Sequence, residues 1–214
     1  LRASDVDVPA DFSSAAFLLV AASIVPGSDL VLEAVGMNPR RTGLLATLRD
    51  MGADITIKRE AVQGGEVVAD LRVRHAPLYG IEVPVERVPD MIDEFPALFV
   101  AAAVAEGPTV VRGAAELRVK ESDRLATMST ALRTLGARID ETPDGATIHG
   151  GTALTGGHVH AHGDHRIAMS AAIAGQLASA PVHIEDCDNV ATSFPGFVEL
   201  TTSIGFTLSH NRPA

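Results

Sequence analysis

Hydrophobic and polar positions along this chain alternate between the period of a helix and the period of a strand. Apolar stretches rich in alanine predict three helices that pack closely on other elements, at residues 15–25, 94–105 and 166–177. Shorter β-branched and aliphatic runs predict strands at residues 6–8, 30–32, 55–57, 67–73, 81–85, 110–111 and 182–184, and residues 146–159 are expected to close the sheets. This alternation of helices and strands predicts an α/β fold.

The order of the predicted elements recurs three times. Each pass contains an apolar helix, a strand, a polar loop and an amphipathic helix that ends at a glycine, namely Gly52, Gly136 and Gly205. Glycine suits these positions because it adopts the left-handed backbone that ends a helix. With a spacing of roughly 75 residues, these glycines predict three copies of one helix-strand-helix-strand unit in one domain, each ending in a hairpin-like pair of strands. The alternative is a chance match, because Leu-Gly-Ala is a common helix ending.

The composition argues against several classes of partner. A formal net charge of -10 and a pI near 5.2 argue against nucleic acid or an anionic membrane surface as the main partner. No uninterrupted apolar run reaches the length of a membrane span. The single cysteine, Cys187, cannot form a disulfide framework, so we expect a reducing, cytoplasmic environment. Any anionic ligand must therefore be held by a local cluster of cations.

The densest charge lies at residues 118–124, directly before an apolar segment of helical period. If that helix begins near Glu121, then Lys120, Glu121 and Arg124 project from one face of its first turn. Two cations at the positive end of the helix dipole favour an anion between them, and a carboxylate there can act as an acid or a base. The alternative is a solvated turn whose acids pair with its cations. The matching loop of the third predicted unit has no cation, so the asymmetry of the repeat favours the charged loop as the site.

Two further charged stretches are candidates for the same site. Asp93 lies in the sequence Asp-Met-Ile-Asp-Glu-Phe-Pro at residues 90–96, which opens the second apolar helix. Its acids could alternatively be no more than helix caps. Asp164, His165 and Arg166 open the third apolar helix in the same way, and Arg166 is again a cation at a helix N-terminus.

A zinc hydrolase is an alternative interpretation of the same region. The pattern H-x-H-x-D-H is formed by His160, His162, Asp164 and His165. Such sites need further ligands downstream, where few histidines remain, and the positive charge of Arg166 would lie beside the metal ion. Surface histidines on a strand are the remaining explanation.

Six motifs occur along the chain in a characteristic order. They are Asp-Phe-Ser-Ser-Ala-Ala-Phe at residues 11–17, Met-Asn-Pro-Arg-Arg-Thr-Gly at 37–43, Met-Ile-Asp-Glu-Phe-Pro at 91–96, Leu-Arg-Val-Lys-Glu-Ser-Asp-Arg-Leu at 117–125, Asp-His-Arg-Ile-Ala-Met at 164–169 and Thr-Ser-Phe-Pro at 192–195. Together they resemble the motifs of the family of 5-enolpyruvylshikimate-3-phosphate (EPSP) synthases. They follow the family's order along almost the whole chain. The residues of these motifs are closer to those of the glyphosate-tolerant, class II-like bacterial branch than to those of the plant-like branch.

The resemblance implies a two-domain enzyme, each domain being an inside-out α/β barrel of three βαβαββ repeats. This chain would supply a crossover strand between the domains at residues 1–10 and the C-terminal enolpyruvyl-transferase domain at residues 11–214. The missing N-terminal domain would provide a lysine and an arginine for phosphoenolpyruvate and polar groups for shikimate 3-phosphate, and the family's first residues would complete the C-terminal domain. The resemblance therefore implies that this chain is inactive or nearly so by itself, and that the full enzyme is a cytoplasmic monomer without a metal or organic cofactor.

The family transfers the enolpyruvyl group of phosphoenolpyruvate to the 5-hydroxyl of shikimate 3-phosphate and releases phosphate. By position, Asp93 resembles the general base, and Glu121 resembles the acid that protonates the methylene carbon of phosphoenolpyruvate. The resemblance assigns Lys120 and Asp93 to shikimate 3-phosphate, and Arg124, Arg166 and Glu121 to phosphoenolpyruvate. His165 is a weaker candidate that would support these groups.

Two positions depart from the family pattern, and two other functions stay open. Thr192 stands where many members have a lysine that would bind phosphoenolpyruvate, and Glu116 stands where many have an asparagine near shikimate 3-phosphate. The sister transferase that acts on UDP-N-acetylglucosamine would share the fold, although its site normally lacks the Lys-Glu-Ser-Asp-Arg wording. A binding module that holds a ligand without turnover is the third possibility.

Overall fold

The computed structural model describes residue 5 and residues 7–209. Its helices are α1 (Phe12–Ile24), α2 (Gly43–Asp50), α3 (Phe95–Val104), α4 (Arg124–Thr134), α5 (His165–Gly175), α6 (Val190–Ser193) and α7 (Phe197–Ser203), with 3-10 helices η1 (Val85–Glu94) and η2 (Ala115–Val119). Its strands are β1 (Asp29–Gly36), β2 (Asp54–Gln63), β3 (Glu66–Arg74), β4 (Pro108–Val111), β5 (Arg138–Thr142), β6 (Gly145–His149), β7 (Gly157–His160) and β8 (Val182–Glu185).

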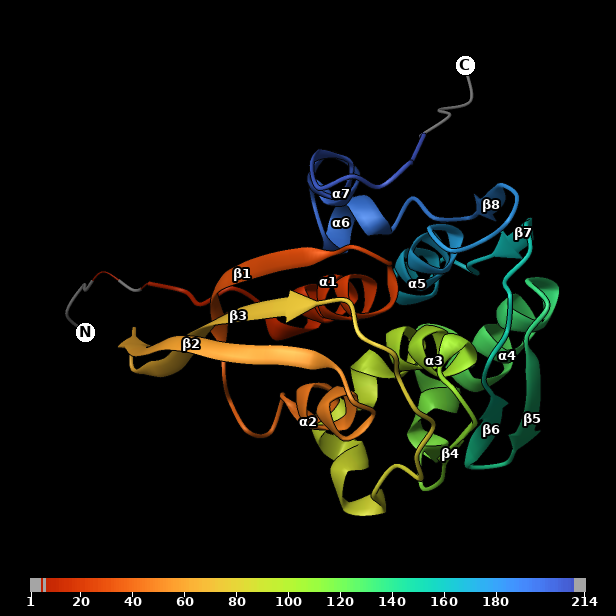
Figure 1. Ribbon diagram of the computed structural model, residues 1–214, viewed down its shortest axis with the longest axis horizontal. Coiled ribbons are helices and arrows are strands. Elements are labelled where there is room, and N and C mark those ends of the chain that lie inside the picture. The colour runs from red at the N-terminus through yellow and green to blue at the C-terminus, as the bar shows by residue number, and fades with distance from the viewer. Residues whose placement is uncertain (1–4, 6, 210–214) are drawn as a thin grey trace.

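Three helices, α1, α3 and α5, form the centre of the molecule (Figure 1). They are apolar around their circumference and not on one face only; nine of the ten residues of α3 are buried. A helix that is hydrophobic on all sides must be enclosed by other elements, and its alanines allow neighbouring helices to approach closely. The three alanine-rich helices predicted from the sequence are therefore confirmed as the core.

The sheets lie outside this helical centre (Figure 1). The first has the order β1-β3-β2 and the second the order β4-β6-β5, and both are antiparallel. An additional parallel bridge joins Ala10 to Val35 in the first unit, and another joins Glu82 to Val110 in the second. Each of these two units therefore follows the βαβαββ order with its first helix inside, which is the predicted inside-out arrangement.

The third unit is shorter than predicted. It contains β7, α5 and β8, with β7 and β8 paired in parallel, followed by α6 and α7. Within residues 7–209 it has no closing pair of strands, so the expected third hairpin is not part of the described structure. The helix-closing glycines of all three units do adopt the predicted left-handed backbone, with φ of 98° at Gly52, 93° at Gly136 and 107° at Gly205.

Three local predictions differ from the structure. Residues 81–85 form a single isolated bridge, at Glu82, and not a strand, because Pro84 has no backbone N–H to donate and η1 begins directly after it. The expected crossover strand lies partly outside the described residues, and residues 7–9 form no strand. The polar loop predicted at residues 189–195 contains the short helix α6.

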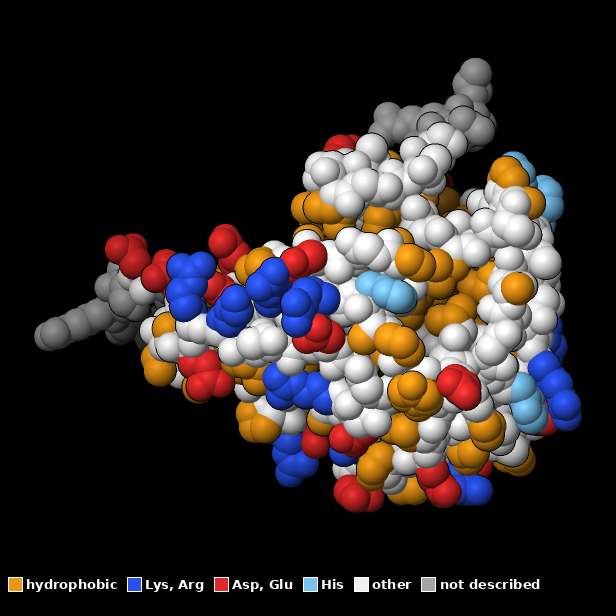
Figure 2. Space-filling model, in the orientation of Figure 1, with side chains coloured by type: hydrophobic (Ala, Val, Ile, Leu, Met, Phe, Trp, Pro, Cys, Tyr) orange, Lys and Arg blue, Asp and Glu red, His pale blue; other side chains and the backbone are white. Residues whose placement is uncertain are grey.

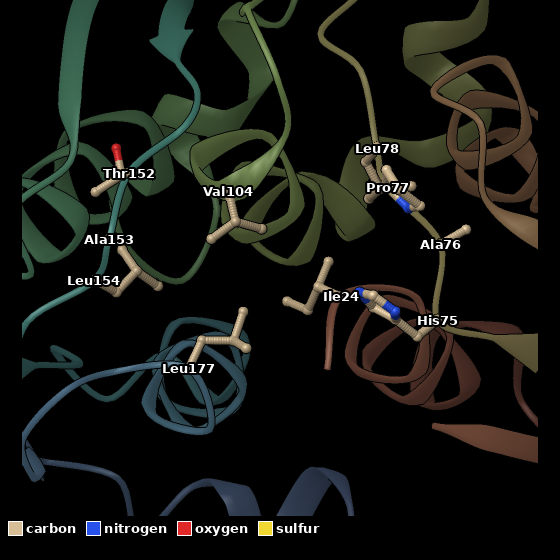
Figure 3. Close-up of a pocket in the computed structure, with 10 residues that line it drawn as sticks. All are labelled: Ile24, His75, Ala76, Pro77, Leu78, Val104, Thr152, Ala153, Leu154 and Leu177. Carbon is tan, nitrogen blue, oxygen red and sulfur yellow. The ribbon is translucent and has the colours of Figure 1, made fainter. Parts of the chain in front are cut away.

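A cavity of about 280 Å³ lies at the C-terminal ends of the three central helices (Figure 3). Ile24, Val104 and Leu177 line it from these ends, and the segments 75–78 and 152–154 line it from the loops that follow the first two sheets. Most of its side chains are apolar, and its few polar groups include no carboxylate, lysine or arginine. The charged motifs lie near the opposite ends of the same helices, so this cavity is no candidate for their chemistry.

The outer surface of the first sheet carries both signs of charge. Figure 2 shows basic and acidic side chains interspersed there, and two of the pairs are Arg72 with Asp29 and Arg74 with Asp54. Exposed pairs of this kind contribute little stability, on the order of 0–1 kcal/mol each. No helix in the described part of the chain is long and apolar enough to span a membrane.

We predict that Gly136→Ala lowers the free energy of unfolding of this chain by about 1 kcal/mol. The cause is backbone strain and not collision, because an added Cβ would meet no atom nearer than 3.5 Å. Gly175→Ala is the control: Gly175 lies at the end of α5 without a positive φ, so alanine should leave stability unchanged or raise it by up to about 1 kcal/mol. Urea unfolding measures both, and equal destabilisation by the two variants would contradict the assigned helix end.

Candidate active site

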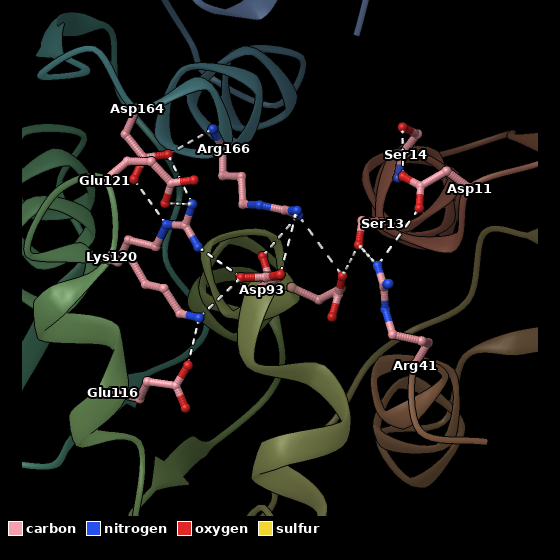
Figure 4. A network of polar contacts seen from close by, with 12 residues as sticks. Asp11, Ser13, Ser14, Arg41, Asp93, Glu116, Lys120, Glu121, Asp164 and Arg166 are labelled. Atoms are coloured by element: carbon pink, nitrogen blue, oxygen red, sulfur yellow. Dashed lines mark hydrogen bonds and ion pairs between the residues drawn. The ribbon is translucent and has the colours of Figure 1, made fainter. Parts of the chain in front are cut away.

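Charged residues from distant parts of the sequence meet where α3, α4 and α5 begin (Figure 4). Asp93 lies at the end of η1, Arg124 is the first residue of α4, and Asp164 is the N-cap of α5. The helix starts bring their backbone N–H groups and positive dipole ends to one place, which favours carboxylates and other anions there. The predicted convergence of the three charged stretches is thus present in the structure.

Arg124 is the centre of the cluster, and its side chain is only 1% exposed. Its Nε donates to Asp164 Oδ2 at 2.8 Å, its Nη1 to Asp93 Oδ1 at 3.1 Å and its Nη2 to Glu121 Oε2 at 2.5 Å. Burying a guanidinium is costly unless its N–H groups are paired, and here three carboxylates pair with it. Arg124 therefore orients three acids as well as carrying charge.

Helix α4 begins later than predicted. Asp123 is its N-cap, accepting a hydrogen bond from the backbone N–H of Ala126 at 3.0 Å, so the first helical residue is Arg124 and not Glu121. Lys120 and Glu121 consequently lie before the helix, and the prediction that they project with Arg124 from one face of its first turn is wrong. The two cations meet instead through a shared carboxylate, that of Asp93.

Asp93 is clamped by three cations. Arg124 Nη1 lies 3.1 Å from Oδ1, Lys120 Nζ lies 3.7 Å from Oδ1, and Arg166 Nη2 lies 3.7 Å from Oδ2. Burial acts to raise the pKa of Asp93, but Arg166, Lys120 and Arg124 together hold its pKa below the usual value. Asp93 is therefore ionised near neutral pH and, with its side chain 35% exposed, can accept a proton from a ligand.

The alternative that the acids of residues 90–96 are no more than caps of α3 is not supported. Glu94, and not Asp93, occupies the N-cap position of α3, and its side chain makes no capping hydrogen bond. The carboxylates of both residues face side chains of other elements instead, Arg124 and Lys120 for Asp93 and Ser13 for Glu94. Asp93 and Glu94 therefore bind side chains of the charged cluster and do not cap α3.

Glu121 is more accessible than Asp93, and Lys120, with its side chain 22% exposed, is less so. The side chain of Glu121 is 50% exposed and contacts Arg124, so it can move without breaking the buried part of the cluster. Lys120 Nζ also lies 2.6 Å from Glu116 Oε1, so the residue that departs from the family pattern pairs with the expected shikimate 3-phosphate ligand. Thr192, the other departure, is exposed on α6.

The position of Asp164 does not fit the zinc interpretation. Its side chain is fully buried, and its Oδ2 accepts hydrogen bonds from Arg124 and from Ser122 Oγ at 3.0 Å. Burial acts to raise its pKa, but the hydrogen bonds and charge of Arg124 hold the pKa below the usual value. With that carboxylate committed to Arg124, the predicted metal-ligand set lacks its aspartate.

The histidines near β7 pair with one another. The rings of His160 and His162 are 4.3 Å apart, and His158 stacks on His183 at 4.7 Å. Among the described residues, no group of three or more His, Cys, Asp or Glu side chains is arranged to hold a metal ion. His165 is the remaining histidine of the motif; burial and the charge of Arg166 lower its pKa, which favours a neutral ring.

Sequence reasoning missed an extension of the cluster into the first unit. Ser13 Oγ donates to Glu94 Oε1 at 2.5 Å, and Arg41 Nη2 donates to Ser13 Oγ at 2.8 Å (Figure 4). Burial raises the pKa of Glu94, although Ser13 and the nearby Arg166 oppose that rise. Ser13 and Arg41 both lie within quoted family motifs, and this was the available signal for them.

Comparison with known proteins identifies the family of this chain. A model of the EPSP synthase family, 3-phosphoshikimate 1-carboxyvinyltransferase, matches residues 1–200. A curated 3-phosphoshikimate 1-carboxyvinyltransferase of Xanthomonas euvesicatoria pv. vesicatoria (strain 85-10) is 69% identical over 208 residues, which are 97% of this chain and 47% of the relative. A relative with the same name from Xanthomonas campestris pv. campestris (strain B100) is 69% identical over 209 residues, 98% of this chain and 48% of its own length.

Solved structures give the same result. An EPSP synthase from Acinetobacter baumannii is 49% identical with a TM-score of 0.94, covering 97% of this chain and 48% of that one. The enolpyruvyl transferase NikO from Streptomyces tendae, at 20% identity and a TM-score of 0.71, shares the fold over 97% of this chain and 45% of its own. This chain spans about half the length of the curated relatives it matches. The motif resemblance is confirmed: the chain belongs to the EPSP synthase family.

Proposed function

We propose that this chain is the C-terminal half of a 3-phosphoshikimate 1-carboxyvinyltransferase. The enzyme moves the enolpyruvyl group of phosphoenolpyruvate to the 5-hydroxyl of shikimate 3-phosphate and releases phosphate. The observation that carries the proposal is the clamp on Asp93, where three cations hold one ionised, accessible carboxylate beside a second that is half exposed, that of Glu121. Such a site can bind anionic substrates and move protons to and from them.

Asp93 is the proposed general base. Its lowered pKa keeps it ionised near neutral pH, so it can take the proton of the 5-hydroxyl as that oxygen attacks, or a proton lost when phosphate leaves. Lys120, 3.7 Å from Asp93, is the proposed cation for shikimate 3-phosphate. A phosphate bound by Lys120 would bring the hydroxyl of the same substrate toward the base.

Glu121 is the proposed acid that protonates the methylene carbon of phosphoenolpyruvate. In this structure it occupies Arg124 Nη2 at 2.5 Å, and its half-exposed side chain can leave. A substrate anion that takes its place on Arg124 leaves the carboxyl group of Glu121 facing that substrate, where it can act as the acid. Arg166 is the second proposed cation for phosphoenolpyruvate, and His165 stays a weaker supporting candidate.

Asp164 is proposed to anchor Arg124 throughout the reaction. From a fully buried position it accepts hydrogen bonds from Nε at 2.8 Å and from Nη2 at 3.4 Å, whereas Asp93 and Glu121 bind Nη1 and Nη2 from partly exposed positions. The two contacts to Asp164 hold the guanidinium plane, and the N–H groups that face Asp93 and Glu121 stay available to exchange a protein carboxylate for a substrate anion. Asp164 thus takes no part in proton transfer.

The charge balance of the cluster supports a missing half. Five carboxyl groups, those of Asp93, Glu94, Glu116, Glu121 and Asp164, face the three cations Lys120, Arg124 and Arg166. On the side of the first unit, Arg41 and its partner Asp11 add one charge of each sign. Two phosphorylated substrates would be poorly held by such a surface, so further cations must come from another part of the enzyme. We assign that role to an N-terminal domain, with residues 1–10 as the crossover strand and residues 11–214 as the C-terminal domain. A monomeric, cytoplasmic enzyme without cofactor remains a prediction from the resemblance.

The test of the reaction uses a chimaera in which this chain replaces the 208 matching residues of the Xanthomonas euvesicatoria relative. We predict phosphate release from shikimate 3-phosphate and phosphoenolpyruvate by the chimaera and not by this chain alone. Asp93→Asn and Glu121→Gln should each lower kcat by about 100-fold or more, because each removes a proton-transferring group. Glu33→Gln, an exposed carboxylate on β1, is the control and should change nothing.

Two results would contradict this proposal. Turnover that is indifferent to both substitutions would leave the fold standing and remove the site assignment. A folded chimaera without turnover would favour the sister transferase or a binding module, and titration with UDP-N-acetylglucosamine and with each shikimate-pathway substrate separates those two cases.

The anchoring role of Asp164 predicts a pH-dependent loss of stability. At pH 7, Asp164→Asn should lower the free energy of unfolding by about 3 kcal/mol, because it leaves Arg124 buried with an unpaired Nε. The folded-state pKa of Asp164 is lowered, so its stabilisation is complete above the unfolded pKa of about 3.9 and is lost as the pH falls through the folded value. Urea unfolding from pH 7 to pH 3 should therefore show the difference shrinking toward low pH. Asp188→Asn, at an exposed position, is the control; a constant difference across the range would refute the anchor.

A further inference from the structure

Glu94 is a buried carboxyl group that the proposed reaction does not use. It is 2% exposed and directly follows Asp93, the proposed base. A carboxyl group in such a place costs free energy unless other groups compensate for its lost hydration. Its partners therefore indicate what it does.

Those partners come from other units of the fold. Ser13 on α1 donates to Glu94 Oε1 at 2.5 Å, and Arg41, just before α2, donates to Ser13 Oγ at 2.8 Å. Arg166 on α5 places its Nη1 3.9 Å from the same Oε1. One carboxylate oxygen thus joins the first unit to a proposed substrate ligand of the third (Figure 4).

We propose that Glu94 is a positioning residue for Arg166, and that Ser13 of the first unit fixes the carboxylate in its place. This inference rests on the proposed function, because it concerns how Arg166 presents itself to phosphoenolpyruvate. It extends the functional cluster into a unit that supplies none of the proposed substrate ligands or proton-transferring groups.

The contacts of Arg166 show how this positioning works. Its Nη1 donates to the backbone oxygen of Asp93 at 3.2 Å and faces the Glu94 carboxylate. The Nη1 side of the guanidinium therefore contacts a backbone oxygen and a buried carboxylate, neither of which can move far. Its Nη2 lies 3.7 Å from the more accessible Asp93 Oδ2. With Nη1 held, Nη2 is the edge that is free to exchange a carboxylate for a substrate anion. Without Glu94, one backbone acceptor is left to define the plane of the guanidinium.

The charged state of Glu94 depends on every element packed around it. Burial and the negative charge of Asp93 on η1 raise its pKa, while Ser13 on α1, Arg166 on α5 and Arg41 before α2 act in the opposite direction. The net pKa is raised, so Glu94 takes up a proton at a higher pH than an ordinary glutamate does. When it is neutral it attracts Arg166 less and the hold on Nη1 weakens.

Steady-state kinetics of the chimaera test the proposal. Glu94→Gln should raise KM for phosphoenolpyruvate about tenfold, because a misplaced ligand binds less well, while kcat and KM for shikimate 3-phosphate change by less than about twofold. Ser13→Ala should act in the same direction, and it should add nothing in the Glu94→Gln background. Asp70→Asn is the matched control: Asp70 is 8% exposed and pairs with Arg59 on the first sheet, so its loss removes a buried carboxylate without touching the cluster.

Two further measurements separate positioning from a general structural role. The ratio of KM for phosphoenolpyruvate between Glu94→Gln and the unmodified chimaera should fall toward one as the pH falls, since the side chain at position 94 is then neutral in both proteins. Taking the ratio cancels the titration of the substrate itself. In this chain alone, a double-mutant cycle of Glu94→Gln with Arg166→Met should show a coupling of about fivefold in the unfolding equilibrium constant.

The results that would contradict the positioning role of Glu94 differ from those that would contradict the proposed function. An unchanged or lowered KM for phosphoenolpyruvate, equal effects on both substrates, or no coupling between Glu94 and Arg166 would overturn the positioning role. A folded chimaera that turns over neither substrate would instead defeat the proposed function. The role of Glu94 in substrate binding would fall with it, and any coupling measured in unfolding would then report a structural pair only.

Discussion

The ion pair between Arg124 and Asp164 is the interaction on which the arrangement of this molecule's charged end depends. It joins the start of α4 to the N-cap of α5, and both side chains are almost completely withdrawn from water. Charges in such a place are tolerated only when each is satisfied, so the pair fixes how the second and third units meet. Asp93 and Glu121, the other acids that bind Arg124, can then be more exposed because they do not have to hold these units together.

The three central helices impose a second constraint, because their N-termini lie together. Each has an acidic residue at its N-cap: Asp11 for α1, Glu94 for α3 and Asp164 for α5. Like ends of helix dipoles repel, and negative charge placed there offsets the repulsion. The fold therefore creates a region that attracts anions before any substrate ligand is considered. The cations of the second and third units then determine which anions can replace the protein's own carboxylates.

The sequence could predict the first two units of the repeat and the central residues of the cluster, but not how these residues pair or that the cluster extends to Ser13, Arg41 and Glu94. Glycine at the helix ends and alanine-rich apolar stretches have local physical causes, and the structure agrees with both. The start of α4 was misplaced because Glu121 and Asp123 are both plausible near a helix N-terminus, and only the hydrogen bond from Ala126 to Asp123 separates them. The burial of Arg124 and the partnership of Ser13 with Glu94 depend on residues 40 and 81 positions away, which no local pattern reveals.

The sheets join residues that are close in sequence and the charged cluster joins residues that are far apart, which has a consequence for how the chain folds. The first two sheets are each built from one continuous segment, β1 to β3 and β4 to β6, so their strand pairing needs only loops of modest length to close. The charged cluster instead needs η1, α4 and α5, and through Ser13 also α1, to be packed against one another. Contacts over such sequence separations form late, because loop-closure entropy must be overcome before they stabilise anything. The cluster is therefore complete only when the whole chain has folded, and an intermediate with native sheets would still lack it.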